Sequence, residues 1–479
     1  MKHRQFPQAG TTLIAGLAVA LLLYGCVHPV KAPPSKVPVP AKLDEQVAEG
    51  TETTGQDLGR WWMAWHEPAL DALINEALEA NTDIRTAQAH LAEARAMTTV
   101  AESALYPTVF AQGSVWGAEA DWRTPTVPLF PLGSASKVSS GAYGGIAGLG
   151  ASWEPDVFGR NRAEVAAARA VAASTVHSLH GAHVTVVADV AENYQEARGL
   201  QLRIDVLDRG IATLERLLGY VQARYEAGQA FTYDVDLVRE QLDLQRAKRP
   251  PLLALIEARR RRLAVLSGKP PEAAVALPQM APYNIPSAPA GLVPVQVLER
   301  RPDVQARAEM VRAQAARLQR ANTDLLPRFG ISFLGGDAEL HFEGLPNFGV
   351  TGGLLNLTAY LPLFTAGRIR ANIAANDARL VAAVADYDAS VLKALEDVEN
   401  AYRLRSALDQ RSTSLRAALS AAHRNEVAST DLYELGRKTF RDVLDDRLSA
   451  LNDEDELVQA EMGQATATVQ LYRALGGGW

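Results

Sequence analysis

Cysteine is nearly missing from this chain: Cys26 is the one cysteine in 479 residues. That count excludes a disulfide scaffold and a cysteine-based zinc cluster. The chain also has fewer positive than negative residues: 48 Lys and Arg against 55 Asp and Glu, for a formal net charge of -7. This balance argues against a nucleic-acid partner, whose phosphates require clustered cations. With 48% hydrophobic and 22% charged residues, the chain is neither a disordered polyelectrolyte nor a polytopic helical membrane protein.

The usual motifs of catalysis and cofactor binding are missing as well. The sequence has no Gly-x-Ser-x-Gly elbow and no phosphate loop ending in Gly-Lys-Ser/Thr. His177, His180 and His183 are spaced by three residues, which spreads them around a helix instead of converging them on a metal ion. We therefore expect no enzymatic activity, no cofactor and no metal site.

Long apolar runs are limited to Leu13–Leu23, which is too short to span a membrane as a helix. The run follows two basic residues and ends at Leu23-Tyr24-Gly25-Cys26, which resembles a bacterial lipoprotein cleavage box. We interpret residues 1–25 as a signal peptide and Cys26 as the lipidated first residue of the mature protein. An ordinary signal peptide with an incidental cysteine is the alternative. Val27 is not the Asp that retains such lipoproteins at the inner membrane, so we expect anchoring in the outer membrane.

Residues 26–60 contain several closely spaced prolines, which is typical of an extended tether. The rest of the chain is an internal duplication. Residues 78–107 align without gaps on residues 298–327, and Tyr225-Glu226-x-Gly228 recurs 208 residues later as Tyr433-Glu434-x-Gly436.

Each repeat has the same predicted plan: a helix, a strand-rich insert, a very long helix, a turn and a return helix. The first repeat covers residues 61–268, with helices over 68–106 and 159–268 and an insert at 107–158. The second covers residues 297–479, with helices over 302–326 and 367–475 and an insert at 327–364. Residues 269–296 are predicted to link the two repeats.

The inserts alternate apolar and polar residues with the period of two that is typical of strands, for example from Leu355 to Leu361. Each insert predicts one β-hairpin, with turns at 125–136 and 344–347, and hence four strands per chain. Such strands suit an outer-membrane barrel, with a soluble sandwich as the alternative. Four strands cannot close a barrel, so several chains would have to share one; the pattern permits two, three or four.

The long helices follow from the lack of proline between Asp156 and Arg249 and after Leu363. A helix of 67 residues would be roughly 100 Å long. From Leu200 to Tyr225, apolar residues recur in steps of four and three, which predicts a coiled-coil seam. The second repeat has a weaker seam, with these polar residues at core-type positions: Ser412, Glu426 and Ser429.

Several motifs occur in a fixed order along this duplicated chain. They are Trp61-Trp62 with Glu67-Pro68, Trp153 through Arg160, Leu298 through Val304, and Pro362-Leu363-Phe364 before Gly367-Arg368. With these motifs, the sequence resembles the TolC-like outer-membrane efflux proteins, specifically the NodT-type lipoproteins of RND efflux systems. The resemblance covers nearly the whole mature chain.

The resemblance implies a mainly α fold with β: a homotrimer whose twelve strands close one outer-membrane barrel, continued into the periplasm by a long-helix α-barrel. It implies a passive exit duct for small molecules such as drugs or toxic compounds, working with a periplasmic adaptor and an inner-membrane RND pump. It also implies an equatorial bend where Pro250-Pro251 interrupts the return helix. Two alternatives remain: a non-conducting, lipid-anchored periplasmic coiled coil, and the same duct serving type I protein secretion.

The resemblance places adaptor docking at the helical turns, where the candidate residues are Arg224, Tyr225, Gly228, Tyr433 and Gly436. As the alternative, both turns simply connect two helices and bind no partner. Two acids lie beside the second turn, and a threefold axis would repeat them in a negative ring that favours cations. Ordinary solvated charges are the alternative for this pair, Asp431 and Glu434.

Overall fold

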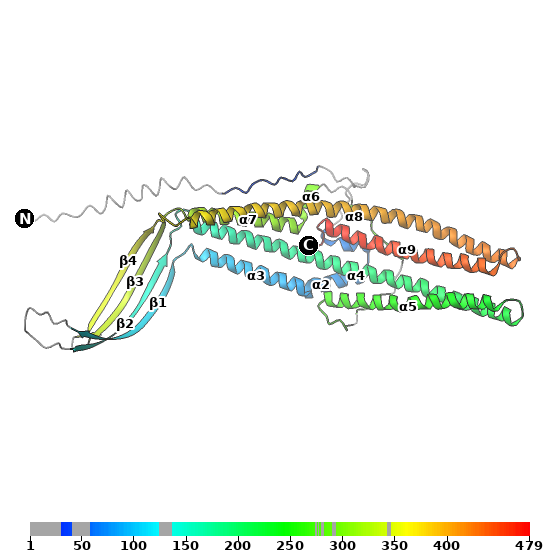
Figure 1. The fold of residues 1–479 in the computed structure, drawn as a ribbon, viewed down its shortest axis with the longest axis horizontal. Coiled ribbons are helices and arrows are strands. Elements are labelled where there is room, and N and C mark those ends of the chain that lie inside the picture. The colour runs from blue at the N-terminus through cyan, green and yellow to red at the C-terminus, as the bar shows by residue number, and fades with distance from the viewer. Residues whose placement is uncertain are drawn as a thin grey trace, which may run out of the picture. The chain divides into compact units, whose positions relative to one another are not determined.

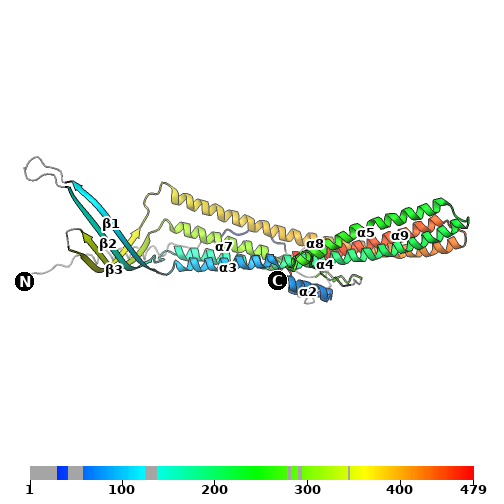
Figure 2. The ribbon, with the colours of Figure 1, turned by 90° about the horizontal axis from the view of Figure 1, so that it is seen from below.

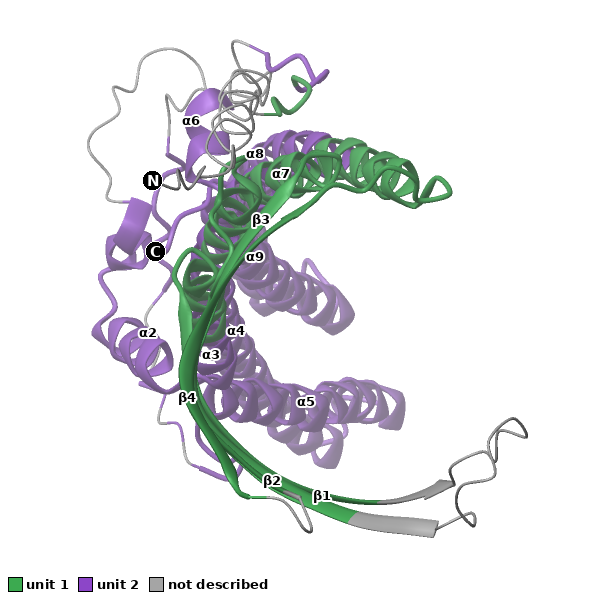
Figure 3. Ribbon diagram, turned by 90° about the vertical axis from the view of Figure 1, so that its left-hand side faces the viewer, with its two compact units in different colours: residues 1–34, 93–172, 309–384 green, residues 35–92, 173–308, 385–479 purple. Residues whose placement is uncertain are grey.

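The computed structural model describes most of the chain, namely residues 30–40, 58–123, 137–273, 275, 277–278, 282–289, 294–342 and 346–479. The predicted signal peptide, Cys26, the turn at 125–136 and half of the turn at 344–347 lie outside these residues. The chain forms two compact units, each built from both repeats (Figure 3). Unit 1 comprises residues 1–34, 93–172 and 309–384, and unit 2 comprises residues 35–92, 173–308 and 385–479.

Helices account for most of the described structure, and the two longest contain 67 residues each (Figure 1). Their bounds are η2 Leu58–Trp65, α2 Pro68–Ala80, α3 Thr82–Ser103, α4 Arg160–Glu226, α5 Thr232–Leu266, α6 Pro294–Arg300, α7 Pro302–Thr323, α8 Arg368–Glu434 and α9 Phe440–Ala474. Within the described ranges, no helix is both long and apolar enough to cross a membrane.

Helix α5 is continuous through Pro250 and Pro251, so the predicted interruption there is wrong. Proline removes an intrahelical hydrogen bond, but packing can compensate for that loss. On α5 the turns after the prolines bury Leu252 and Ile256 against Leu200 and Leu207 of α4, and this packing holds the helix in place beyond the prolines.

Four strands in unit 1 form one antiparallel sheet in the order β1-β2-β3-β4. Their bounds are β1 Thr108–Arg123, β2 Lys137–Trp153, β3 Arg328–Phe342 and β4 Phe348–Tyr360. Each repeat contributes one hairpin, and β2 pairs with β3 to join the two. Strands β1 and β4 each pair on one side only, so they are the edges of this sheet. The predicted mainly α fold with four strands per chain is confirmed.

Residues 30–40 are extended, as predicted for the tether, but they pack on the helices. In unit 1, Val30 and Ala32 lie against a cluster that includes Leu318 and Leu380. In unit 2, Val37 packs against Leu298 and its neighbours. This stretch of the tether is therefore docked on the protein.

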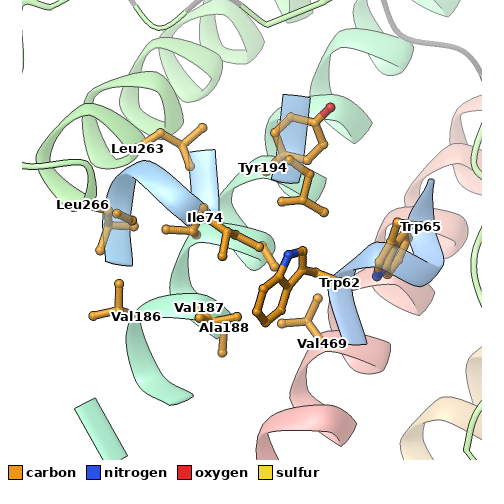
Figure 4. Close-up of a cluster of buried hydrophobic side chains, with 14 of the residues drawn as sticks. Trp62, Trp65, Ile74, Val186, Val187, Ala188, Tyr194, Leu263, Leu266 and Val469 are labelled. Carbon is orange, nitrogen blue, oxygen red and sulfur yellow. The ribbon is translucent and has the colours of Figure 1, made fainter. Parts of the chain in front are cut away.

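The largest core lies in unit 2, where η2 and α2 pack on α4, α5 and α9 (Figure 4). Trp62, Ile74 and Leu263 belong to this cluster, and the Trp61 ring stacks on Tyr472 with centroids 4.8 Å apart. Large aromatic side chains bury more apolar surface than any others. The tryptophans before α2 therefore fasten the N-terminal segment across helices of both repeats.

From this core two helical hairpins extend side by side, one formed by α4 and α5 and the other by α8 and α9 (Figures 1 and 2). The ends of these hairpins carry the residues that the sequence singles out.

Candidate functional site at the helical turns

Both hairpins turn through a glycine with a left-handed backbone. Gly228 has φ +73° and Gly436 has φ +71°, a conformation that only glycine adopts without strain. At the first turn the Gln229 amide donates to the Arg224 carbonyl at 2.7 Å, and at the second the Arg437 amide donates to the Leu432 carbonyl at 2.8 Å. These bonds close the ends of α4 and α8 in the same Schellman-type pattern.

The return helices begin at acidic caps. The Phe231 amide donates to the Asp234 carboxylate at 3.0 Å, and the Thr439 amide donates to the Asp442 carboxylate at 2.7 Å. In the second turn the Asp442 amide also donates to the Thr439 hydroxyl at 3.3 Å, which completes a capping box. Hydrogen bonds from Thr439 lower the pKa of Asp442. Caps and glycines together make each turn a rigid, short connection.

The two hairpins are linked at their ends by arginine–tyrosine pairs. Arg224 of α4 donates to the Tyr433 hydroxyl at 2.5 Å and to the Tyr220 hydroxyl at 3.2 Å, and its guanidinium lies 5.7 Å from the Tyr433 ring centroid. Arg441 of α9 donates to the Tyr233 hydroxyl of α5 at 3.3 Å. Burial is the main cause that raises the pKa of Tyr433.

The first hairpin has an apolar seam along its whole length. Leu214, Val221, Val235 and Val238 are buried between α4 and α5 near the turn. Leu444 of α9 belongs to the same cluster, so the second hairpin also packs into this seam. The predicted seam of the first repeat is confirmed from Leu200 to Val221, whereas its last predicted member, Tyr225, is exposed.

The second hairpin replaces that seam with polar side chains. Ser429 is fully buried and occupies the position of Val221 in the first repeat. Glu426 occupies the position of Leu218 and pairs with Arg447 of α9 at 3.0 Å. Polar contacts contribute less net free energy than equal apolar burial, because the groups lose hydrogen bonds to water.

A polar network continues the second seam toward the large core. Arg405 is 4% exposed and donates to the Thr468 hydroxyl at 2.6 Å. It also pairs with Asp409, which in turn accepts a hydrogen bond from Gln464. The second hairpin is thus held by directional contacts where the first is held by apolar packing.

A groove of about 660 Å³ lies between α4, α5 and α9, on the core side of the turns. Its lining comes from α4, α5 and α9 and includes Leu207, Lys248 and Leu451. One wall is fixed by Arg203, whose guanidinium pairs with Asp455 at 2.8 Å. The lining of the groove therefore combines apolar and charged side chains.

The candidate acids Asp431 and Glu434 are both exposed on the last turn of α8. Tyr225, the first-repeat counterpart of Tyr433, is 46% exposed and makes no side-chain hydrogen bond among the described residues. The structure therefore joins Arg224 to Tyr433 and leaves Tyr225 and the two acids facing solvent in the single chain.

The histidines do not form a metal site in the part of the chain that the structure describes, where no group of three or more His, Cys, Asp or Glu side chains converges. The rings of His177 and His180 lie 6.1 Å apart, and His180 stacks on Trp479 at 4.2 Å. Burial is the main cause that lowers the pKa of His180, with the neighbouring histidines adding to it.

The model of the outer membrane efflux protein family matches residues 73–269 and 293–477, which is most of the chain. This chain belongs to the outer membrane efflux protein family. The match spans both repeats, so the four strands, the long helices and both turns all lie within it.

Two relatives and two solved structures illustrate what this outer membrane efflux protein is similar to. The antibiotic efflux pump outer membrane protein ArpC of Pseudomonas putida is 26% identical, over 98% of this chain and 96% of the relative. The pyoverdine export outer membrane protein OpmQ of Pseudomonas aeruginosa is 28% identical, over 92% and 93%.

The solved outer-membrane channel OprN superposes with a TM-score of 0.82 at 27% identity, over 94% of this chain and 99% of that one. The open state of the Neisseria gonorrhoeae MtrE outer membrane channel superposes with a TM-score of 0.79 at 24% identity, over 95% and 98%, which supports the fold.

Sequence reasoning named Arg224 and Tyr433 but predicted neither arginine–tyrosine link, and it missed the Arg405 network of this outer membrane efflux protein. A signal was present in the alignment of the repeats, where Tyr233 corresponds to Arg441 and Ile256 to Gln464. Such exchanges between equivalent positions mark places where the repeats have taken different roles. Their pairing across helices could not be read from sequence, because it depends on how the hairpins pack.

Proposed function

We propose that three copies of this chain form the exit duct of a tripartite efflux system, carrying small molecules from the periplasm across the outer membrane. The supporting observation in the strands is that β1 and β4 are unpaired edges. Edges in lipid leave backbone groups without hydrogen bonds, and a twelve-stranded barrel made by three sheets removes them. A periplasmic adaptor and an inner-membrane RND pump would deliver the cargo.

Lipidation of Cys26 would anchor each chain in the outer membrane, and the docked segment 30–40 supports an N-terminus held along the helices. The relatives' names include antibiotics, toluene, pyoverdine and cations. We propose drugs or other toxic small molecules as cargo. The docking of the adaptor is proposed at the turns, with Arg224, Tyr225, Gly228, Tyr433 and Gly436 as the contact region.

The observation that carries a gated duct is the difference between the two hairpins. The first is joined by an apolar seam and the second by polar contacts at Glu426, Ser429 and Arg405. Polar contacts exchange readily with water, whereas apolar packing does not. We propose that α8 and α9 move when the duct opens, while α4 and α5 remain in place.

Three copies of Asp431 and Glu434 around a threefold axis would form a negative ring at the closed end. We propose that this ring makes the duct prefer cations. The purified wild-type protein in planar bilayers should give small cation-selective currents, and Asp431→Ala/Glu434→Ala should raise the conductance or reduce the selectivity. Glu226→Ala, the repeat-equivalent of Glu434 on α4, is the matched control.

Folded trimers of the double variant with unchanged conductance and unchanged selectivity would show that the acids do not lie at the constriction. Folded monomers that give no current at all would favour the non-conducting periplasmic coiled coil instead of the duct.

A further inference from the structure

The four-stranded sheet is curved, and its glycines show which face is concave (Figure 3). A Cβ added at Gly144 would lie 2.8 Å from the Glu339 carbonyl oxygen, and one at Gly148 would lie 2.6 Å from the Gly335 carbonyl oxygen. On the opposite face, a Cβ added at Gly117 or Gly349 would meet nothing within 4 Å. Neighbouring backbones converge on the concave side of a bent sheet. The face of Gly144 and Gly148 is therefore the concave face.

The convex face changes from apolar to polar along the strands. Near the helices, Ile331 pairs with Leu357 and Phe333 pairs with Leu355 on this face. Near the hairpin turns, the same face carries Asp337 and Glu339 in register with β2 and β4. On β3 and β4 the apolar band that would meet lipid therefore lies in the helix-side half of the strands. On β1 and β2 the convex face also has Val115 and Tyr143 near the level of Glu339.

The concave face changes in the opposite direction. Near the helices it carries Ser332 paired with Asn356, and Gly330 paired with Thr358. Toward the turns it becomes apolar, and we name this area the concave patch: Trp116, Ile146, Leu334, Leu340, Val350 and Leu354. On β3 and β4 the two faces of the sheet thus exchange polarity halfway along the strands.

Charge is nearly excluded from the concave face. Among the strand side chains that the structure describes, Arg328 is the one charged group on this face, and it pairs with Asp324 at 2.6 Å at the helix end. Glu119, Asp337 and Glu339 all lie on the convex face. A wide aqueous pore ordinarily has a polar lining, so apolar side chains toward the duct's interior need an explanation.

We propose that the concave patch is a binding surface for uncharged aromatic or apolar small molecules on their way out. This rests on the proposed function, because closing the barrel with two further copies turns the concave face toward the lumen. Val350 and Leu354 are 61% and 66% exposed, so they are free to contact a solute. A hollow of about 1050 Å³ borders Trp116, Leu340 and Phe348, which is enough space for a drug-sized molecule. Its lining also includes Asp337 and Glu339 at convex-face positions of β3.

The glycines serve this surface directly. A Cβ at Gly144 would lie 3.0 Å from the Trp116 ring, so glycine lets the indole lie flat over the neighbouring strand. An indole held in this way offers an aromatic face without a large entropy loss on binding. Weak contacts of this kind would let a solute bind without being retained.

Photolabelling with benzophenone tests the concave patch. The full-length protein in lipid nanodiscs is irradiated with this uncharged aromatic probe, and adducts are mapped by peptide mass spectrometry. We expect adducts at Leu340 and Leu354 on the concave face, besides lipid-side adducts at residues such as Leu357. The anionic probe 4-benzoylbenzoate should leave Leu340 and Leu354 unlabelled, because this area has no cation to pair with it.

Leu340→Asn/Leu354→Asn should lower concave-face labelling by roughly fivefold, since about 40 Å² of apolar contact is lost at about 25 cal/mol per Å². Glu339→Gln/Thr351→Asn is the matched control, because it changes neighbouring positions of the same strands on the convex face. Labelling of Leu357 serves as an internal reference in both variants.

Adducts confined to the convex face in the wild-type protein would overturn the inference, whether or not the variants fold. Conductance of the same wild-type preparation separates the two proposals. Currents without concave adducts would leave the duct intact and remove the binding surface, whereas folded monomers that fail to conduct would contradict the duct itself.

Discussion

Tyr433 and Tyr225 show how one residue in two equivalent places acquires two roles. They correspond in the repeats, yet Tyr433 accepts a hydrogen bond from Arg224 and Tyr225 faces solvent. The difference arises because α8 lies beside the end of α4, where Arg224 can reach it. Tyr433 therefore ties the second hairpin to the first.

Tyr433→Phe should shift the duct toward its open state. Loss of the hydroxyl removes a hydrogen bond worth about 1 kcal/mol, which corresponds to roughly a fivefold shift in the closed-to-open equilibrium. Single-channel recording should show longer or more frequent openings. Tyr225→Phe is the matched control and should behave as wild type; equal effects of the two variants would contradict a link at Tyr433.

Arg301 is a second residue whose partners come from several elements. It lies before α7, is 8% exposed, and donates to Asp303 at 2.7 Å, to Asp397 of α8 at 3.0 Å and to the Ala474 carbonyl at 3.3 Å. Arg301→Met should destabilise unit 2 by about 2 kcal/mol, a value reduced because both carboxylates are partly exposed. Thermal unfolding measures this change, with Arg300→Met as the control.

The same contact predicts a pH dependence. Hydrogen bonds and charge from Arg301 outweigh desolvation and lower the pKa of Asp303 below its ordinary value of 3.8. A carboxyl with a lowered pKa stabilises the fold fully above its unfolded value, and this contribution disappears as the pH falls through the folded value. The difference between wild type and Arg301→Met should therefore shrink below about pH 4, and a constant difference would exclude the ion pair as its cause.

At the scale of elements, the helices of the two hairpins have equal lengths but are joined by seams of different polarity. Helices α4 and α8 each have 67 residues, and α5 and α9 each have 35. The apolar seam of the first pair and the polar seam of the second make them different mechanical elements. The duplication sets the lengths and the order of the helices. The seam residues determine how easily the two helices of a hairpin separate.

The double variant Leu218→Glu/Val221→Ser places the seam residues of the second hairpin, Glu426 and Ser429, at the equivalent positions of the first. We expect about 3 kcal/mol of local destabilisation, since apolar burial is lost and a carboxylate enters the seam without a placed partner. Hydrogen exchange should rise across the ends of α4 and α5. Gly219→Ser is the control, because an added Cβ there meets nothing within 4 Å. Unchanged exchange in the double variant would show that the seam does not hold the hairpin.

At the scale of the whole molecule, a single chain leaves large apolar side chains exposed on α8. Leu392 is 56% exposed and Leu404 is 46% exposed. Exposed apolar side chains along one helix are typical of surfaces that another chain covers. We assign them to contacts between copies in the proposed trimer.

Leu392→Lys/Leu404→Lys should therefore reduce trimer formation while leaving the single chain folded. Burying an unpaired ammonium costs at least about 2 kcal/mol per copy, enough to lower the trimer fraction markedly. Native mass spectrometry of the detergent-solubilised protein measures the distribution. Lys393→Gln, a neighbouring exposed position, is the control; intact trimers in the double variant would place the interface elsewhere.

The sequence by itself determined the duplication, the two hairpins of helices, the four strands and the glycine turns. These features depend on local rules: period two for strands, period 3.5 for the seam, the lack of proline for the longest helices, and the left-handed backbone that only glycine takes easily. Family membership followed from motifs in order, because they lie along the chain itself.

Tertiary structure alone decided which of the equivalent residues meet. The continuity of α5 through Pro250-Pro251 came from packing of Leu252 and Ile256, which local propensity does not include. The links from Arg224 to Tyr433 and from Arg441 to Tyr233, and the exchange of polarity between the two faces of the sheet, depend on which helices and strands become neighbours. Contacts of this kind join residues some 200 positions apart, and no periodicity within one segment carries that information.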